Sequence, residues 1–338
     1  MIPYLGGDMR RRDFIRLVAS SAAAWPLATR AQQGERIRRI GVLIGATEDD
    51  PETKAGLSAF RQGLEKRGWS EGRNVHIAIH FVGGDANKYG PLAKQLVIAQ
   101  PDVILAQTTP VAAALQRETR QIPTVFVNVS DPIGSGFVAS LARPGGNFTG
   151  VLLYEGSVVG KWLAMLKEMA PRLERVAFVA NPKISPVYDY FLRAAEAAAA
   201  SLGLKVVPTP VSSVTDIKRA IDAFASAPNG GLLLPPDTTT RAHRDLIIAL
   251  AAQYRLPAVY PLHLFVAAGG LMSYGTDQDN MFRLAAFYVD RILRGDKPAE
   301  LPVQAPTKFE TTLNLRTAKA LGLTFPPGLL VAADEVIE

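Results

Sequence analysis

Short polar runs follow several of the strands that the sequence predicts, and such positions could hold a small ligand. The runs are 45–47, 107–109 and 128–132 in the first half of the chain, and 181–182, 235–237 and 273–276 in the second. In open α/β sheets, ligands bind outside the carboxyl ends of the strands. Hydroxyls and helix N-terminal N–H groups suit an anionic head group, and an aspartate suits an ammonium. The same residue types cap helices, so capping explains each position as well as ligand contact does.

The elements that would position these runs alternate along the chain. Short runs rich in β-branched residues predict strands, and apolar residues at helical spacing predict helices between them. The strands are expected at 39–44, 74–81, 103–106, 123–128, 176–180, 205–207, 231–234, 258–260, 270–274 and 308–315. A Gly/Pro-rich stretch, RPGGNFTG at 143–150, interrupts the alternation. We therefore expect two α/β units with parallel sheets and crossover helices, joined near residue 150.

Enzyme and metal chemistry find little support in the motifs. The first strand is not followed by the G-x-G-x-x-G spacing of dinucleotide-binding units, and no phosphate-binding loop or G-x-S-x-G elbow occurs. His76 and His80 share one strand face but have no third ligand at a known spacing, so a solvated face explains them better. Asp277 and Asp279 are typical of a helix N-terminus. We expect neither catalytic residues, nor a metal site, nor a cofactor.

The N-terminus has the layout of an export signal. Three arginines, Arg10–Arg12, precede a short apolar stretch at 17–28, and Thr29 to Ala31 places small residues where a peptidase would cleave. An amphipathic helix or a membrane anchor is the alternative, but about 12 apolar residues are too few to span a bilayer. The run RRDFIR is similar to the twin-arginine motif, although Arg10 departs from it. We expect 1–31 to be a signal peptide cleaved near Ala31, with 1–8 an upstream extension, and the mature chain to be soluble and periplasmic.

The composition of the chain excludes cysteine chemistry and argues against a nucleic-acid partner. The 338 residues include no cysteine, which excludes disulfides, thiolate metal sites and a cysteine nucleophile. The formal net charge is +6, but residues 1–31 hold five arginines against two aspartates, a net of +3. The net charge of the mature chain is therefore only +3. That is too little to argue for nucleic acid as a partner.

Five stretches in order along the chain carry a resemblance to a known family. They are VNVSDPIGSGFV at 127–138, LARPGGNFTG at 141–150, GGLMSYG at 269–275, ILRGDKP at 292–298 and NLRTAKALGL at 314–323. From about residue 36 to the C-terminus, the chain resembles the periplasmic substrate-binding proteins of ABC transporters, in the group that includes tryptophan- and tyrosine-binding members.

The resemblance implies a type I periplasmic binding fold: two Rossmann-like lobes joined by a three-segment hinge that closes on a ligand. It places 36–152 plus 276–305 in lobe one and 153–275 plus 306–338 in lobe two. Ligand-binding positions carried over from it are Thr47, Gln107, Thr108, Ser130 and Asp131 in lobe one, and Asn181, Tyr188, Asp237 and Tyr274 in lobe two.

The function implied is capture of a small organic solute, an aromatic or apolar amino acid or a related aromatic acid, and its delivery to an ABC permease by a monomeric protein. A sensory module that reports to a membrane receptor is the alternative, and the sequence does not separate the two. A hydrolase or dehydrogenase lacks its motifs, and a repressor would need a DNA-reading helix pair where the export signal stands.

Overall fold

The computed structural model describes residues 36–338, so the predicted signal peptide lies outside the described part of the chain. The first sheet has five strands: β1 (Arg38–Ile44), β2 (Val75–Phe81), β3 (Val103–Gln107), β4 (Thr124–Val129) and β5 (Phe148–Leu152). Their order is β2-β1-β3-β4-β5, and all pairs are parallel. Continuous buried apolar runs such as β3 form it, as expected for a sheet covered on both faces.

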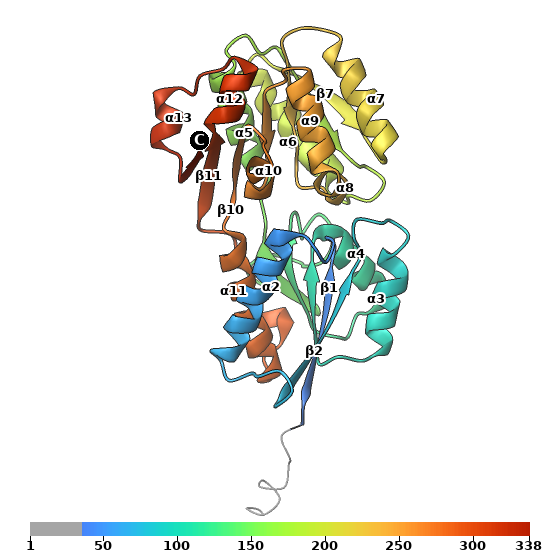
Figure 1. The fold of residues 1–338 in the computed structure, drawn as a ribbon. Coiled ribbons are helices and arrows are strands. Elements are labelled where there is room, and N and C mark those ends of the chain that lie inside the picture. The colour runs from blue at the N-terminus through green and yellow to red at the C-terminus, as the bar shows by residue number, and fades with distance from the viewer. Residues whose placement is uncertain (1–35) are drawn as a thin grey trace, which may run out of the picture.

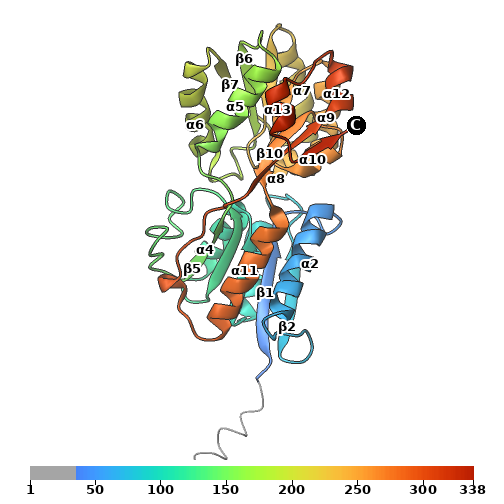
Figure 2. The ribbon, with the colours of Figure 1, turned by 90° about the vertical axis from the view of Figure 1, so that its left-hand side faces the viewer.

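Helices cover both faces of this sheet (Figures 1 and 2). On one face lie α2 (Pro51–Glu65) and α11 (Gln278–Leu293), and on the other α3 (Tyr89–Ile98) and α4 (Thr109–Glu118). The axes of α2 and α11 come close because small residues meet at the contact. A Cβ on Gly56 would lie 2.5 Å from the Phe282 ring, and one on Gly63 would lie 2.7 Å from Ala286 Cβ. This contact holds a late segment of the chain against the first sheet.

The second sheet has seven strands in the order β12-β11-β10-β9-β8-β6-β7. They are β6 (Arg175–Ala180), β7 (Lys205–Pro210), β8 (Gly230–Leu233), β9 (Ala258–Tyr260), β10 (Met272–Thr276), β11 (Phe309–Asn314) and β12 (Glu335–Ile337). The prediction of two α/β units with parallel sheets is confirmed, because the strands of both sheets are mostly parallel. The exception is β11, which pairs antiparallel with β10.

Short connections join the strands of the second sheet to helices on both of its faces. The helices are α5 (Val158–Met169), α6 (Tyr188–Ser201), α7 (Val214–Ala225), α8 (Thr238–Ala242), α9 (Arg244–Gln253), α10 (His263–Ala267), α12 (Leu315–Leu321) and α13 (Pro327–Val331). A short 3-10 turn, Pro298–Glu300, lies beside β5 of the first sheet. Among residues 36–338, no helix is both long and apolar enough to cross a membrane.

The two sheets belong to two bodies stacked end to end (Figure 1). We propose to divide the described chain into a first domain, residues 36–152 with 276–305, and a second domain, residues 153–275 with 306–338. The chain then passes between the domains after β5, after β10 and before β11. At the last passage Val151 and Gln304 form a parallel bridge.

An aromatic cluster surrounds two of these passages. Tyr154 is fully buried, with its ring edge-on to Trp162 at 5.3 Å and stacked on Phe309 at 6.3 Å between centroids. The indole N–H of Trp162 donates to the carbonyl of Tyr274 at 2.8 Å. Buried aromatic pairs of this kind restrict how the passages can move relative to each other.

Candidate functional site

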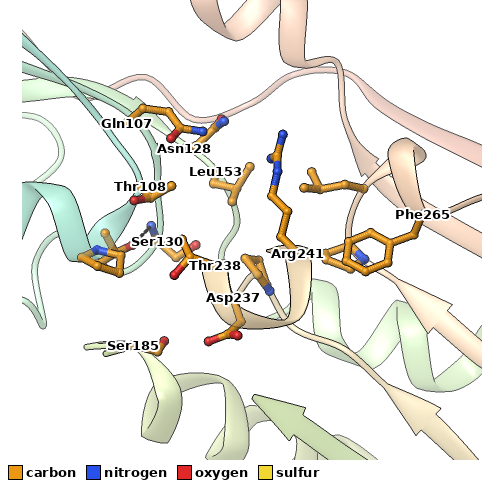
Figure 3. Close-up of a pocket in the computed structure, with 15 residues that line it drawn as sticks. Gln107, Thr108, Asn128, Ser130, Leu153, Ser185, Asp237, Thr238, Arg241 and Phe265 are labelled. Carbon is orange, nitrogen blue, oxygen red and sulfur yellow. Dashed lines mark hydrogen bonds between the residues drawn. The ribbon is translucent and has the colours of Figure 1, made fainter. Parts of the chain in front are cut away.

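A cavity lies between the two domains, at the carboxyl ends of their strands (Figure 3). Its first-domain wall comes from the ends of β3 and β4 and the residues that follow them. Its second-domain wall comes from the loop before α6 and from α8 and α10 with the loops before them. The lining residues are Gln107 to Pro110, Asn128 and Ser130 from the first domain, Leu153 from the first passage between the domains, and Ser185, Pro236 to Thr238, Arg241, Pro261, Leu262 and Phe265 from the second domain. Clefts of this kind at the strand ends of α/β sheets are where ligands bind.

The first-domain wall presents three buried oxygens without partners. Thr108 Oγ1, Asn128 Oδ1 and Ser130 Oγ have no hydrogen-bond partner within the described chain. Leaving a buried polar group unpaired costs about 1–3 kcal/mol, so a native fold rarely accumulates three in one place. All three residues line the cavity. A ligand with polar groups would satisfy them together.

Two residues of the same wall have backbone angles that side chains rarely adopt. Thr108 has φ 87° and Asn128 has φ 57°, values that favour glycine, yet both residues carry side chains. Thr108 is also the N-cap of α4 without a side-chain capping bond. Strained residues of this type cluster at ligand sites, where the surrounding structure holds them in place. Thr108 and Asn128 both line the cavity.

Neighbouring contacts hold this wall in place. The Gln107 side-chain oxygen accepts the Gly45 N–H at 2.9 Å, and Thr109 Oγ1 accepts the Ser130 N–H at 3.1 Å. A Cβ on Gly45 would lie 2.6 Å from Thr108 Oγ1, so the absence of a side chain there leaves room for the Thr108 hydroxyl. The amino end of α4 adds the positive end of a helix dipole. The wall therefore suits an anionic head group.

The second-domain wall carries a buried carboxyl group. Asp237 caps α8 by accepting the Thr240 N–H at 2.8 Å, and it accepts the Asn181 N–H at 3.1 Å. Burial outweighs these hydrogen bonds and raises the pKa of Asp237 to about 6. An ammonium group beside it would favour the charged carboxylate and would be held by it.

Four apolar residues form part of the second-domain lining beside the polar Ser185, Thr238 and Arg241. They are Pro236, Pro261, Leu262 and Phe265, and Leu153 joins them from the first passage between the domains. The Phe265 ring stacks on Tyr260, with 4.9 Å between centroids and 14° between planes. A rigid aromatic surface of this kind suits an apolar or aromatic ligand group.

Arg241 closes one side of the cavity with a buried ion triad. Its Nη2 lies 2.6 Å from Asp50 Oδ1 and 3.1 Å from Glu52 Oε2, across the domain interface. Burial raises the pKa of Glu52. Burial acts the same way on Asp50, but its hydrogen bond and charge interaction with Arg241 prevail and hold that pKa below its usual value. Beyond Arg241 lies a polar outer groove lined by Thr47, Asp49 and Arg244, among others.

Four of the nine residues predicted from the sequence meet in the cavity: Gln107, Thr108, Ser130 and Asp237. Asn181 stands behind Asp237, and its side-chain amide donates to Thr239 Oγ1 at 2.9 Å. The other four lie elsewhere. Thr47 lines the outer groove, Asp131 lines a separate pocket beside Tyr190, Tyr188 packs edge-on to Phe178, and Tyr274 stacks on Phe309.

Several lining residues were not among the nine. Asn128 stands in a strand-end run that the sequence singled out, and its φ is positive. Arg241 follows Asp237 by four residues, so a helix starting at Asp237 would place both on one side. Ser185 and Phe265 carry no sequence signal that separates them from their neighbours.

The histidine pair and the acidic residues do not form a metal site within the described chain. No group of three or more potential metal-ligating side chains occurs among residues 36–338. His76 Nδ1 lies 3.0 Å from Glu71 Oε1 on the exposed edge strand β2. Asp277 caps α11 through the Asn280 N–H at 3.0 Å, as its position predicted.

Two α/β domains around a cavity that combines polar groups on both walls with an apolar surface on the second define a type I periplasmic binding fold suited to a small molecule. The chain belongs to the ABC transporter substrate-binding protein family, whose model matches residues 42–337. The resemblance found in the sequence is therefore confirmed.

Three proteins of known structure or name are similar to this chain over most of its length. The chain is similar to a conserved domain protein of Vibrio cholerae (27% identity, TM-score 0.83, covering 89% of this chain and 100% of that one). It is also similar to an ABC domain from Streptococcus pneumoniae in complex with L-Trp (25% identity, TM-score 0.82, covering 89% and 99%). A tyrosine-binding protein of Clostridioides difficile is 24% identical over 293 residues, covering 85% of this chain and 82% of the relative.

Proposed function

We propose that this chain captures an α-amino acid with an aromatic or apolar side chain and delivers it to the permease of an ABC transporter. The observation that carries the proposal is the set of three unpartnered oxygens facing the buried carboxyl of Asp237 across one cavity. A zwitterion with an apolar side chain complements a site of this composition. The relatives that are named for tyrosine or that hold L-Trp support the same ligand class.

In this proposal, different residues bind the carboxylate, the ammonium group and the side chain of the amino acid. The Thr108 and Ser130 hydroxyls donate to the carboxylate beside the amino end of α4. The ammonium group is held by the Asp237 carboxylate and by Asn128 Oδ1, which accept hydrogen bonds. The side chain packs on Phe265 and Leu262. Arg241 takes no part in binding the carboxylate, because its charge is satisfied by Asp50 and Glu52.

Capture works by domain closure. Both walls are needed to enclose the ligand, so an open form binds it on one wall and closure adds the other. The protein binds and releases its ligand without a chemical step. We place it in the periplasm, as the N-terminal pattern of the sequence predicts.

A thermal-shift panel tests the ligand class. L-Tryptophan, L-tyrosine, L-phenylalanine and L-leucine are compared with L-glutamate, L-lysine and glucose, since a ligand that binds the native state raises its melting temperature. We expect a rise with one or more of the first four. Thr108→Val should remove the rise, because it deletes a cavity hydroxyl and keeps the side-chain shape. Thr47→Val is the matched control in the outer groove and should keep it.

No rise with any amino acid would contradict the ligand class. Retention of the full rise in Thr108→Val would contradict the assigned wall. Delivery is tested separately, as uptake of the labelled amino acid into membrane vesicles that hold the cognate permease. Uptake that does not depend on this protein would contradict the transport role.

A further inference from the structure

Four hydrogen bonds connect the first-domain wall of the cavity to its second-domain wall through the hinge. Asn128 Nδ2 donates to Gln278 Oε1 at 2.6 Å, and Gln278 Nε2 donates to Thr276 Oγ1 at 3.0 Å. The Thr276 N–H donates to Tyr154 Oη at 3.3 Å, and the Tyr154 hydroxyl donates to the Pro261 carbonyl. Asn128 and Pro261 both line the cavity, whereas the three residues between them do not.

The middle of this relay lies on the passages between the domains. Tyr154 follows β5 at the first passage, Thr276 ends β10 at the second, and Gln278 begins α11 just beyond it. Gln278 and Thr276 are buried, with exposed fractions of 8% and 6%, and Tyr154 is fully buried. Buried polar groups that lose a partner are costly, so the relay favours the one domain arrangement in which all its members are paired.

Close packing leaves the relay little freedom. A Cβ on Gly275 would lie 2.5 Å from the Pro261 carbonyl oxygen and 2.8 Å from Tyr154 Oη. Tyr154 is also held between Trp162 and Phe309. A rotation at the second passage must therefore displace Tyr154, Pro261 or both.

We propose that Gln278 is a positioning residue that couples ligand contact at Asn128 to domain closure. The proposal rests on the proposed function. Asn128 lines the cavity, and the two polar atoms of its side-chain amide have different surroundings. Its Oδ1 has no partner within the described chain, whereas its Nδ2 donates to Gln278. A ligand group bound to Oδ1 fixes the orientation of this amide and so strengthens the contact with Gln278. The relay then stabilises the hinge geometry that brings Pro261 and its neighbours onto the ligand.

Gln278→Met tests the coupling, because methionine keeps the length of the side chain and removes both hydrogen bonds. With L-tryptophan and L-tyrosine as probes in calorimetry, we expect affinity to fall about 5- to 150-fold, the range for leaving a buried donor unpaired. Asp279→Asn is the control, one residue further on the same helix and outside the relay, and it should leave affinity unchanged. Tyr154→Phe removes the far end of the relay without touching Asn128 and should weaken binding in the same direction.

A double-mutant cycle separates positioning from packing. In an Asn128→Ala background, Gln278→Met should cost no further affinity, because its effect passes through Asn128. Fully additive losses would overturn the proposal. So would wild-type affinity in both Gln278→Met and Tyr154→Phe.

Hydrogen exchange of the ligand-free protein tests the relay without any added amino acid. Gln278→Met should speed exchange at the Thr276 amide and the adjoining hinge, whereas Asp279→Asn should not. Unchanged exchange in Gln278→Met would overturn the relay. If the wild-type protein binds no amino acid while exchange responds as expected, the proposed function fails and the structural part of the relay stands.

Discussion

Replacing Arg241 by methionine removes the charge that joins the two domains beside the cavity. The guanidinium makes two hydrogen bonds to Asp50, at 2.6 and 3.2 Å, and an ion pair to Glu52 at 3.1 Å. The Asp50 and Glu52 side chains are only 3% and 14% exposed. Arg241 belongs to the second domain and both carboxylates belong to the first. Removing the guanidinium therefore destabilises the arrangement in which the two domains are closed on each other.

The size of this loss follows from burial. Removing one partner of a buried ion pair costs about 3–5 kcal/mol. The pKa of Glu52 is already raised by burial, so a proton can neutralise that carboxyl and reduce the cost. Arg244 Nη1, 4.0 Å from Asp50, supplies a little compensating charge. We expect about 2–3 kcal/mol against closure, which weakens ligand binding about 30- to 150-fold.

Calorimetry with L-tryptophan or L-tyrosine measures the affinity, and small-angle scattering measures how far the ligand closes the domains. Arg241→Met combined with Asp50→Asn should recover part of the loss. This double variant removes one orphaned charge, and asparagine still caps α2. Affinity within twofold of wild type in Arg241→Met, with normal closure, would show that the ion triad does not stabilise the closed arrangement.

Three further outcomes are expected. Asp237 keeps a proton in the native state between its usual pKa of 3.8 and about 6, so the stability of the ligand-free protein should fall as pH rises through that window. Over the same window, affinity for an ammonium-bearing ligand should rise. Denaturation and ligand titration at pH 5 and 7.5 measure the two trends, and Asp237→Asn should flatten both. Gly45→Ala should displace the Thr108 hydroxyl and weaken binding about tenfold in calorimetry, with little change in melting temperature. Trp162→Ala should cost about 3–5 kcal/mol in chemical denaturation, since the ring is fully buried, and a loss under 1 kcal/mol would contradict its packing role.

Most strands of the two sheets could be anticipated from the sequence because they are short runs rich in β-branched and other apolar residues, separated by helical periodicity. The antiparallel direction of β11 could not. β10 leads the chain out of the second domain and β11 leads it back, so neighbouring strands at the hinge must run in opposite directions. The composition of a six-residue strand such as β11 carries no mark of its direction.

The candidate site could be anticipated only in part. Strand ends point to loops that line the cavity, and Gln107, Thr108, Ser130 and Asp237 at those ends do line it. They do not reveal which way a side chain points, and the rings of Tyr188 and Tyr274 pack on Phe178 and Phe309 and do not line the cavity. The role of Arg241 depends on carboxylates about 190 residues earlier in the chain. Only the folded arrangement of the two domains brings those groups together.

The proposed ligand class is tested most sharply by one calorimetric series on protein refolded from denaturant to remove any bound ligand. The titrants are L-tryptophan, tryptamine, which lacks the carboxylate, and indole-3-propionate, which lacks the ammonium; L-tyrosine, tyramine and the matching phenolic acid form a parallel set. We predict one site per chain for at least one of the two amino acids, with both of its truncated analogues binding much more weakly. Equal binding of an amino acid and its analogues, or no binding by either set, would contradict a cavity built for a zwitterion with an aromatic side chain.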